Sequence, residues 1–327
     1  MTDADGPTSR STKSMAELRL DLIWGAWAEL GVAGWPSTHG NWAIDPEPLI
    51  LHTARVGDDD PRLRDEATDW CIKCWRYVSR IRLRNLLREE DPELQARFGE
   101  FAATVNAHAR VNWPGATRAR PYRPTGRSAL PSLDHPALVP LRLRAMFGLG
   151  ARTEILRHFL SNQGGYSVAT LAASTGYAKR NVAEECESLE RAGVLAVRQI
   201  ANRFYYSLGR RSELAAFVGD QPSIWPPWSS LLRVVDTCVD LELAAQTTPD
   251  RVMAAEARKA LDAIEEQLDN LRIEGPDQPA KGSSLWPPME TWGKDLMARW
   301  AKGRWPTATN TEPAASEIAV RRIARRS

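Results

Sequence analysis

Apolar residues recur at intervals of three and four along most of the chain, which is the spacing of amphipathic helices. On this basis helices are expected over residues 15–33, 46–56, 61–77, 79–88 and 91–109. Asp45 and Asp60 precede the second and third of these and are good N-cap residues. No part of the stretch alternates with period two, as a half-buried strand would. We therefore expect an all-α N-terminal domain over residues 15–109, preceded by a polar, disordered tail of residues 1–14.

Residues 110–136 differ in composition from the segments on either side. They hold five arginines and five prolines, with no acid before Asp134, and Arg118, Arg120 and Arg123 lie near the centre. Such a basic, proline-rich segment is typical of a linker. One interpretation is an arm that lies along DNA phosphates or enters a minor groove, and the other is a solvated tether. Five arginines without acids exceed what a spacer needs, which favours nucleic acid.

Residues 137–210 show a different pattern of three helices followed by two strands. The helices are expected over 152–160, 168–174 and 178–192, and the strands over 195–200 and 204–208. Ser167 can cap the second helix, and Gly176 suits the turn Thr175-Gly-Tyr177 that follows it. Val182, Cys186 and Leu189 form the core face of the third helix. The segment Ala201-Asn-Arg203 bridges the strands.

Four more helices are expected in a C-terminal region over residues 211–305, at 211–218, 228–246, 249–272 and 289–300. The long helix over 249–272 carries an apolar stripe that can either pack within the chain or form a homodimer. A basic tail over residues 306–327 ends in the cluster Arg321-Arg-Ile-Ala-Arg-Arg326. The predicted fold class is thus mainly α, with an N-terminal helical domain, a central α unit with a small β-ribbon, and C-terminal helices.

Composition narrows the functions that the chain can have. Its 327 residues include 43 basic and 41 acidic side chains, a net charge of +2, so any nucleic-acid site must be local. No apolar run reaches about 18 residues, and no signal peptide is visible, so neither a membrane span nor export is expected. Four cysteines are too few for a disulfide framework, which favours the cytoplasm. Cys71 and Cys74 read as packed residues of one helix rather than a metal or redox pair.

The segment over roughly 140–208 resembles the winged helix-turn-helix transcriptional regulators of the ArsR and MarR kind. The residues that carry the resemblance are Leu171-Ala-Ala173, Gly176, Val182, Leu189-Glu-Arg-Ala-Gly-Val-Leu195, Arg198 and Tyr206. The resemblance implies that the third helix enters the major groove of double-stranded DNA and that the strands form a wing. The flanking segments resemble, more loosely, bacterial winged-helix antitoxin-repressors encoded beside nucleotidyltransferase toxins.

The resemblance also assigns roles to individual residues. Lys179, Arg180 and Asn181 would lie in the major groove, where arginine suits guanine and asparagine suits adenine. Tyr177 and Lys179 would contact phosphates, and Arg198 and Arg203 would carry the wing. Against this, Glu184, Glu185 and Glu187 follow on the third helix, and acids near phosphates lower affinity.

Three classes of function remain to be compared. We expect a DNA-binding regulator, a repressor, without cofactor or bound metal. The alternative is a protein-interaction module, such as an antitoxin whose acidic helix neutralises a basic partner and which can also regulate its own gene. An enzyme is not expected, because the chain has no GxxxxGK[ST], GxGxxG, HExxH or GxSxG motif, and no catalytic residue is assigned. Asp45, Glu47 and the other N-terminal acids are interpreted as helix caps and solvated loop residues.

Overall fold

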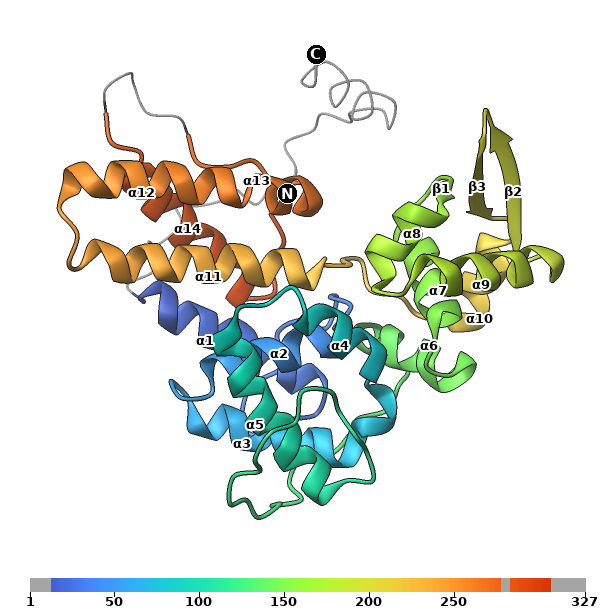
Figure 1. The fold of residues 1–327 in the computed structure, drawn as a ribbon, viewed down its shortest axis with the longest axis horizontal. Coiled ribbons are helices and arrows are strands. Elements are labelled where there is room, and N and C mark those ends of the chain that lie inside the picture. The colour runs from blue at the N-terminus through green and yellow to red at the C-terminus, as the bar shows by residue number, and fades with distance from the viewer. Residues whose placement is uncertain (1–12, 278–282, 307–327) are drawn as a thin grey trace, which may run out of the picture.

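The computed structural model describes residues 13–277 and 283–306, and the chain is mainly helical there (Figure 1). Most of the expected N-terminal tail, and the basic tail from residue 307 with its arginine cluster, lie outside the described residues. Ser14 opens the first helix, because its hydroxyl accepts from the Glu17 N–H and the Glu17 carboxylate accepts from the Ser14 N–H. This reciprocal cap satisfies two helix-end amides. Residues 13 and 14 therefore belong to the folded chain, contrary to the expected tail.

Helices from the two ends of the chain pack together into what we call the helical body. Figure 1 shows α11 crossing the middle of the picture, with α12 and α13 on one side, α1–α5 on the other, and α14 passing behind it. The helices of this body are α1 (Met15–Glu29), α2 (Pro46–Val56), α3 (Pro61–Cys74), α4 (Arg80–Leu87), α5 (Pro92–His108), α11 (Trp228–Ala245), α12 (Asp250–Ala263), α13 (Glu265–Leu271) and α14 (Trp286–Ala301). A short 3-10 turn, η1 (Trp75–Tyr77), follows α3.

One core runs through the helical body and includes buried tryptophans from both ends of the chain. Trp70 donates its indole N–H to the carbonyl of Leu30 at 2.6 Å, and Trp228 donates to the carbonyl of Ala43 at 2.7 Å. Each ring thus buries a large apolar area while its polar atom is satisfied by a loop carbonyl. Of the helices in the described residues, none is both long enough and apolar enough to cross a membrane.

The helix α6 (Val139–Phe147), preceded by the 3-10 turn η2 (Pro136–Leu138), leads from the helical body into residues 151–218, which we call the sheet unit. The sheet unit contains α7 (Ala151–Ser161), β1 (Tyr166–Ser167), α8 (Val168–Thr175), α9 (Lys179–Arg191), β2 (Leu195–Ile200), β3 (Arg203–Leu208) and α10 (Arg211–Val218). The strands form an antiparallel sheet in the order β1-β3-β2. The unit has a core of its own, to which Ile155, Phe159 and Val182 belong.

The elements expected over 152–208 are confirmed, with two differences. The strand β1 was not expected, because its two residues are too few to show alternation; Tyr166 lies opposite Tyr206 in β3. Arg203 is not in the turn of the hairpin but in β3, opposite Ile200. The turn is therefore Ala201-Asn202, and Ala201 adopts a positive φ of 49°.

The prediction of a single helix over 249–272 is wrong, because Ile264 interrupts it with φ −104° and ψ 6°. The break separates α12 from α13, and both helices pack against α11. Ile264 and Leu268 are buried by this arrangement, so most of the apolar stripe packs within the chain. Leu243 and Val252 are the large apolar side chains of α11 and α12 that stay exposed.

Candidate nucleic-acid interface

The helices α8 and α9 and the turn between them are built from local signals. Ser167 caps α8 by accepting from the Thr170 N–H at 3.2 Å. Gly176 ends α8 with a φ of 73°, a conformation that is unfavourable for residues with a Cβ atom. Val182, Cys186 and Leu189, which lie on one face of α9, are buried in the core of the sheet unit. The remaining faces of α9 are largely open to solvent.

The first turn of α9 is exposed and cationic. Lys179, Arg180 and Asn181 are all exposed. The N-cap residue is Ala178, whose methyl group cannot accept a hydrogen bond, so no side chain caps the first amides of α9. These amides form the positive end of the helix dipole. This end of the helix therefore offers two cations, one side-chain amide and uncapped N–H groups to a polyanion.

The glutamates that follow on α9 are partly neutralised by arginines. The Arg180 Nε lies 2.9 Å from a Glu184 carboxylate oxygen, and the Arg152 Nε lies 2.8 Å from Glu185. Arg191 and Glu187 form a longer pair at 3.9 Å. The first and last of these pairs are highly exposed, so each contributes little to stability. Their effect is to reduce the negative field that α9 presents beyond its first turn.

The hairpin of β2 and β3 projects from the sheet unit at the upper right of Figure 1. Arg198 lies opposite Tyr205, and Arg203 lies opposite Ile200. Directly opposed residues of an antiparallel pair share a face, so both arginines lie on the same side of the hairpin. The other face carries Leu195, which is buried in the core of the sheet unit. Arg198 and Arg203 thus occupy the outer face, and both are exposed.

Tyr177 is not positioned for the phosphate contact expected of it. Its side chain is buried, and its hydroxyl lies 2.9 Å from the Ser79 hydroxyl. The side-chain amide of Asn85 also donates to the carbonyl of Gly176 at 2.7 Å. Ser79 is the N-cap of α4 and Asn85 lies within that helix. In this conformation Tyr177 therefore attaches the turn to the helical body and is unavailable to a phosphate.

A buried network of charges joins the same two parts of the molecule. Its members are three arginines and three carboxylates: Arg82, Arg144, Arg157, Asp45, Glu47 and Glu154. Arg82 of α4 makes two parallel bonds to Asp45, both of 2.7 Å. Arg144 of α6 bonds Glu47 at 2.8 Å and Glu154 of α7 at 2.7 Å. The network therefore spans α4, the start of α2, α6 and α7.

The balance of charge in this network explains how it can be buried. Burial by itself raises the pKa of Glu154, but the charges of Arg144, Arg82 and Arg157 outweigh burial and bring the pKa to about 2. Asp45 occupies the N-cap position of α2 as expected, but its side chain accepts no hydrogen bond from the amides of α2 and pairs with Arg82 instead. Asp60, in contrast, caps α3 as expected by accepting from the Leu63 N–H at 2.9 Å.

The linker of residues 110–136 is an ordered strap on the helical body. Arg120 pairs with Asp65 at 2.6 Å, and the amides of Thr125 and Gly126 donate to Asp69 at 3.0 and 3.1 Å. These contacts hold the strap against α3, which lies at the lower left of Figure 1, away from the hairpin. The site residues expected in the linker are therefore not brought together with those of α9. Arg118 and Arg123 are exposed on the strap.

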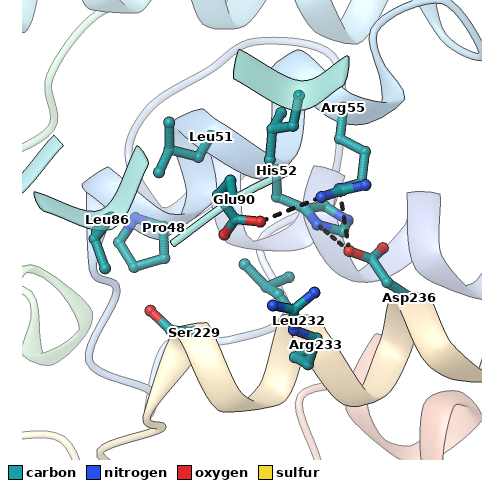
Figure 2. A pocket seen from close by; sticks show the side chains of 11 residues that line it. Pro48, Leu51, His52, Arg55, Leu86, Glu90, Ser229, Leu232, Arg233 and Asp236 are labelled. Carbon is teal, nitrogen blue, oxygen red and sulfur yellow. Dashed lines mark hydrogen bonds and ion pairs between the residues drawn. The ribbon is translucent and has the colours of Figure 1, made fainter. Parts of the chain in front are cut away.

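A second cluster of charges lies where α2 meets α11. Figure 2 shows Asp236 facing His52 and Arg55, with nitrogen–oxygen distances of 3.5 and 3.4 Å. The pocket beside them has a volume of about 40 Å³, which is room for little more than one water molecule. Ser229 lies across the pocket from His52, whose Nε2 has no hydrogen-bond partner among the described residues. These residues do not form the aligned relay that nucleophilic catalysis requires.

Cysteine and metal-ligand chemistry has no assembled site in the described part of the chain. Cys71 and Cys74 are both buried in the core of the helical body, and burial raises the pKa of the Cys74 thiol to about 11. No group of three or more histidine, cysteine, aspartate or glutamate side chains within residues 13–277 and 283–306 is arranged to hold a metal ion.

No family model, curated protein or solved structure matches the chain. The likeness to the ArsR and MarR regulators therefore rests on the residues of the sheet unit. What the chain binds is inferred below from its own geometry and charge.

Proposed function

We propose that residues 137–210 form a winged helix-turn-helix that binds double-stranded DNA, and that the protein is a transcriptional repressor. In this proposal α9 is the recognition helix and the β2–β3 hairpin is the wing. The observation that carries the proposal is the exposed, uncapped first turn of α9, where Lys179, Arg180 and Asn181 stand free of the core. A helix of this kind reads base edges with its N-terminal residues.

The wing and the ion pairs of α9 support the same proposal. Arg198 and Arg203 share the outer face of the hairpin and supply charge for backbone or minor-groove contact. The pairing of Glu184 with Arg180, and of Glu185 with Arg152, lowers the repulsion that the acids would exert on phosphates. Because Glu184 engages only the Nε of Arg180, the terminal nitrogens of the guanidinium stay available for a guanine edge.

The test is a binding titration of the full chain against DNA from upstream of its own gene, with Arg180→Ala as the variant. Arg180 and Arg191 are matched, because each is an exposed arginine of α9 paired with a glutamate one turn away. Arg180→Ala is expected to lose about 1–3 kcal/mol of binding free energy and to relax preference at one base pair. Arg191→Ala, at the far end of the helix, serves as the control. Equal effects of the two variants would contradict the assigned groove contact.

A second candidate function is binding of a protein partner, and the surface of the wing favours it. Phe204, Ile200 and Val197 are exposed, at 55%, 51% and 42%. Val197 and Phe204 lie on the same face of the hairpin, because Phe204 pairs with Gln199, two residues after Val197 in β2. Ile200 lies on the opposite face, with Arg198 and Arg203. Apolar side chains gathered on a projecting hairpin suit a protein contact. Copurification with a co-encoded protein, lost in Phe204→Ser, would support an antitoxin role beside or instead of DNA binding.

A further inference from the structure

A hollow on the helical body lies beside α4, the helix that holds the turn in front of α9. It has a volume of about 490 Å³ and lies between the first half of α4 and the loop 112–116. Arg80, Ile81 and Arg84 line one side, and Asn112, Trp113 and Gly115 belong to the other. The hollow is open and basic, and nothing in the sequence pattern pointed to it.

The charge of the hollow is one-sided. Arg80 and Arg84 are exposed, and the side chain of neither forms an ion pair or a hydrogen bond with another described residue. No acidic residue lines the hollow. Like charges one turn apart on a helix repel each other and lower helix stability. An anion between the two guanidiniums would relieve that repulsion, and the planar fork of arginine matches phosphate oxygens in two-point contacts.

The arginines are presented by a helix that cannot easily move. Arg82, between them in the sequence, is buried in bidentate contact with Asp45, so α4 is anchored by its middle arginine while the outer two face solvent. The next residue after Arg84 is Asn85, which bonds the carbonyl of Gly176. The exposed first turn of α9 begins three residues beyond that glycine. The turn that precedes α9 and the second half of α4 are therefore neighbours.

The hollow is suited to a phosphate and not to a base. Trp113 is 1% exposed, and its ring centroid lies 6.5 Å from those of Phe98 and Phe101, so its face is not free for stacking. Its indole N–H is buried and has no hydrogen-bond partner among the described residues, so the charged donors that the hollow exposes are the two arginines. Two exposed arginines can bind a backbone phosphate, and such a contact carries no sequence information.

We propose that this hollow binds the backbone phosphates that flank the major groove occupied by α9, with Arg80 and Arg84 as the donors. The inference rests on the proposed DNA-binding function and adds a contact outside the winged segment. In this proposal the helical body contacts DNA directly. The contact also determines the side of α9 toward which the duplex extends.

The experiment compares the full chain with Arg80→Ala/Arg84→Ala in DNA titrations over a range of salt concentrations. We expect the slope of log K against log salt to fall by about 1.8 in the variant, and its dissociation constant to rise on the order of tenfold to a hundredfold at about 0.1 M salt. The order of preference among DNA sequences should stay the same, because phosphate contacts carry no sequence information. Arg80→Lys/Arg84→Lys should restore most of the slope. Arg88→Ala, at an exposed arginine that does not line the hollow, is the control.

The outcomes separate the two proposals. If the unmodified chain binds DNA but the double alanine variant keeps its salt slope and affinity, the hollow is not a phosphate site while the proposed function stands. Arg88→Ala removes one arginine and the double variant removes two. If Arg88→Ala lowers the salt slope by half as much as the double variant does, the effect is one of net charge and the hollow proposal fails. If the unmodified chain binds no DNA at any salt concentration, both proposals fail together. Circular dichroism of each variant checks that these exposed replacements leave the fold intact.

Discussion

The hydroxyl of Tyr177 lies 2.9 Å from the hydroxyl of Ser79, although 98 residues separate them in the chain. Tyr177 immediately precedes the N-cap of α9, and Ser79 is the N-cap of α4. The contact therefore fixes the start of α9 to the start of a helix in another part of the molecule. Together with the bond from Asn85 to Gly176, it determines how the exposed turn of α9 is presented.

Replacing Tyr177 by phenylalanine tests whether its hydroxyl has this structural role. Tyr177→Phe removes the bond to Ser79 but keeps the buried ring, so the free energy of unfolding should fall by about 0.5–1.5 kcal/mol. The salt slope of DNA binding should not change, because the hydroxyl does not face a phosphate. Tyr77→Phe, at a half-buried tyrosine of the helical body, is the control for loss of a tyrosine hydroxyl. A slope reduced by about one would instead indicate that Tyr177 contacts DNA.

The buried network predicts a large loss of stability when one of its arginines is removed. Arg144→Met leaves Glu47 and Glu154 buried without their main partner, and breaking such a pair typically costs about 3–5 kcal/mol. Arg88→Met makes the same replacement at an exposed position and should change stability little. Denaturant unfolding measures both variants. The double variant Arg144→Met/Glu154→Gln should lose less than the sum of its single changes, because it removes part of the uncompensated charge.

A loss below about 1 kcal/mol for Arg144→Met would match an exposed ion pair. That result would mean that the network does not hold the sheet unit to the helical body. The same unfolding curves also report whether the two parts separate, since loss of the junction would produce two transitions where one cooperative transition is expected.

The local structure of the sheet unit could be predicted from the sequence, whereas its junction with the helical body could not. The signals for its helices and turn are local. They are the spacing of Val182, Cys186 and Leu189 along α9 and the backbone conformation of Gly176. A tyrosine beside a turn, however, has the same local pattern whether its hydroxyl meets a phosphate or Ser79.

The segment Arg80-Ile-Arg-Leu-Arg84 shows that the sequence also could not predict which arginines are buried in ion pairs. Its three arginines alternate along the chain and look alike in the sequence. Only the carboxylates of Asp45 and Glu47, more than thirty residues earlier, distinguish the buried Arg82 from the exposed Arg80 and Arg84. Those carboxylates were themselves interpreted as a cap and a solvated residue, because pairing across such separations leaves no local signal.

His39 predicts a pH dependence of stability in a defined window. Its Nε2 lies 2.8 Å from the carbonyl of Trp300, which can only accept, so Nε2 carries a proton. Burial lowers the pKa of His39 from 6.5 to about 4. Between these values the unfolded chain binds a proton that the folded chain does not. The contribution of His39 to stability is therefore complete above about pH 6.5 and is lost as the pH falls toward 4.

The variant His39→Gln should reduce this dependence. In the middle of the window one proton corresponds to a slope of about 1.4 kcal/mol per pH unit, so the variant should lose up to that slope. The measurement is the free energy of unfolding at a series of pH values between 7 and 4, with His108→Gln at an exposed histidine as the control. Parallel curves for His39→Gln and the unmodified chain would show that the ring is not held neutral by its burial.

The strap of residues 110–136 gives a prediction that separates its two interpretations. Arg120 bonds Asp65 at 2.6 Å and its guanidinium lies 4.8 Å from the centre of the Tyr122 ring. Arg120→Ala should lower the free energy of unfolding by about 1–2 kcal/mol through these contacts. It should leave DNA affinity and salt slope unchanged, because the side chain is neutralised on the helical body. Arg123→Ala, at an exposed arginine of the same strap, should leave stability unchanged.

The DNA titrations of these two variants decide whether the strap acts as an arm. If the strap stays on α3 and α5 when DNA binds, neither Arg120→Ala nor Arg123→Ala alters the salt slope. If it leaves the helical body to follow the phosphates, each variant lowers the slope by about one. In that case the bonds of Thr125 and Gly126 to Asp69 must break on binding, so Asp69→Asn, which weakens them, would raise DNA affinity. An unchanged affinity for Asp69→Asn, together with unchanged slopes, would establish the strap as a fixed part of the helical body.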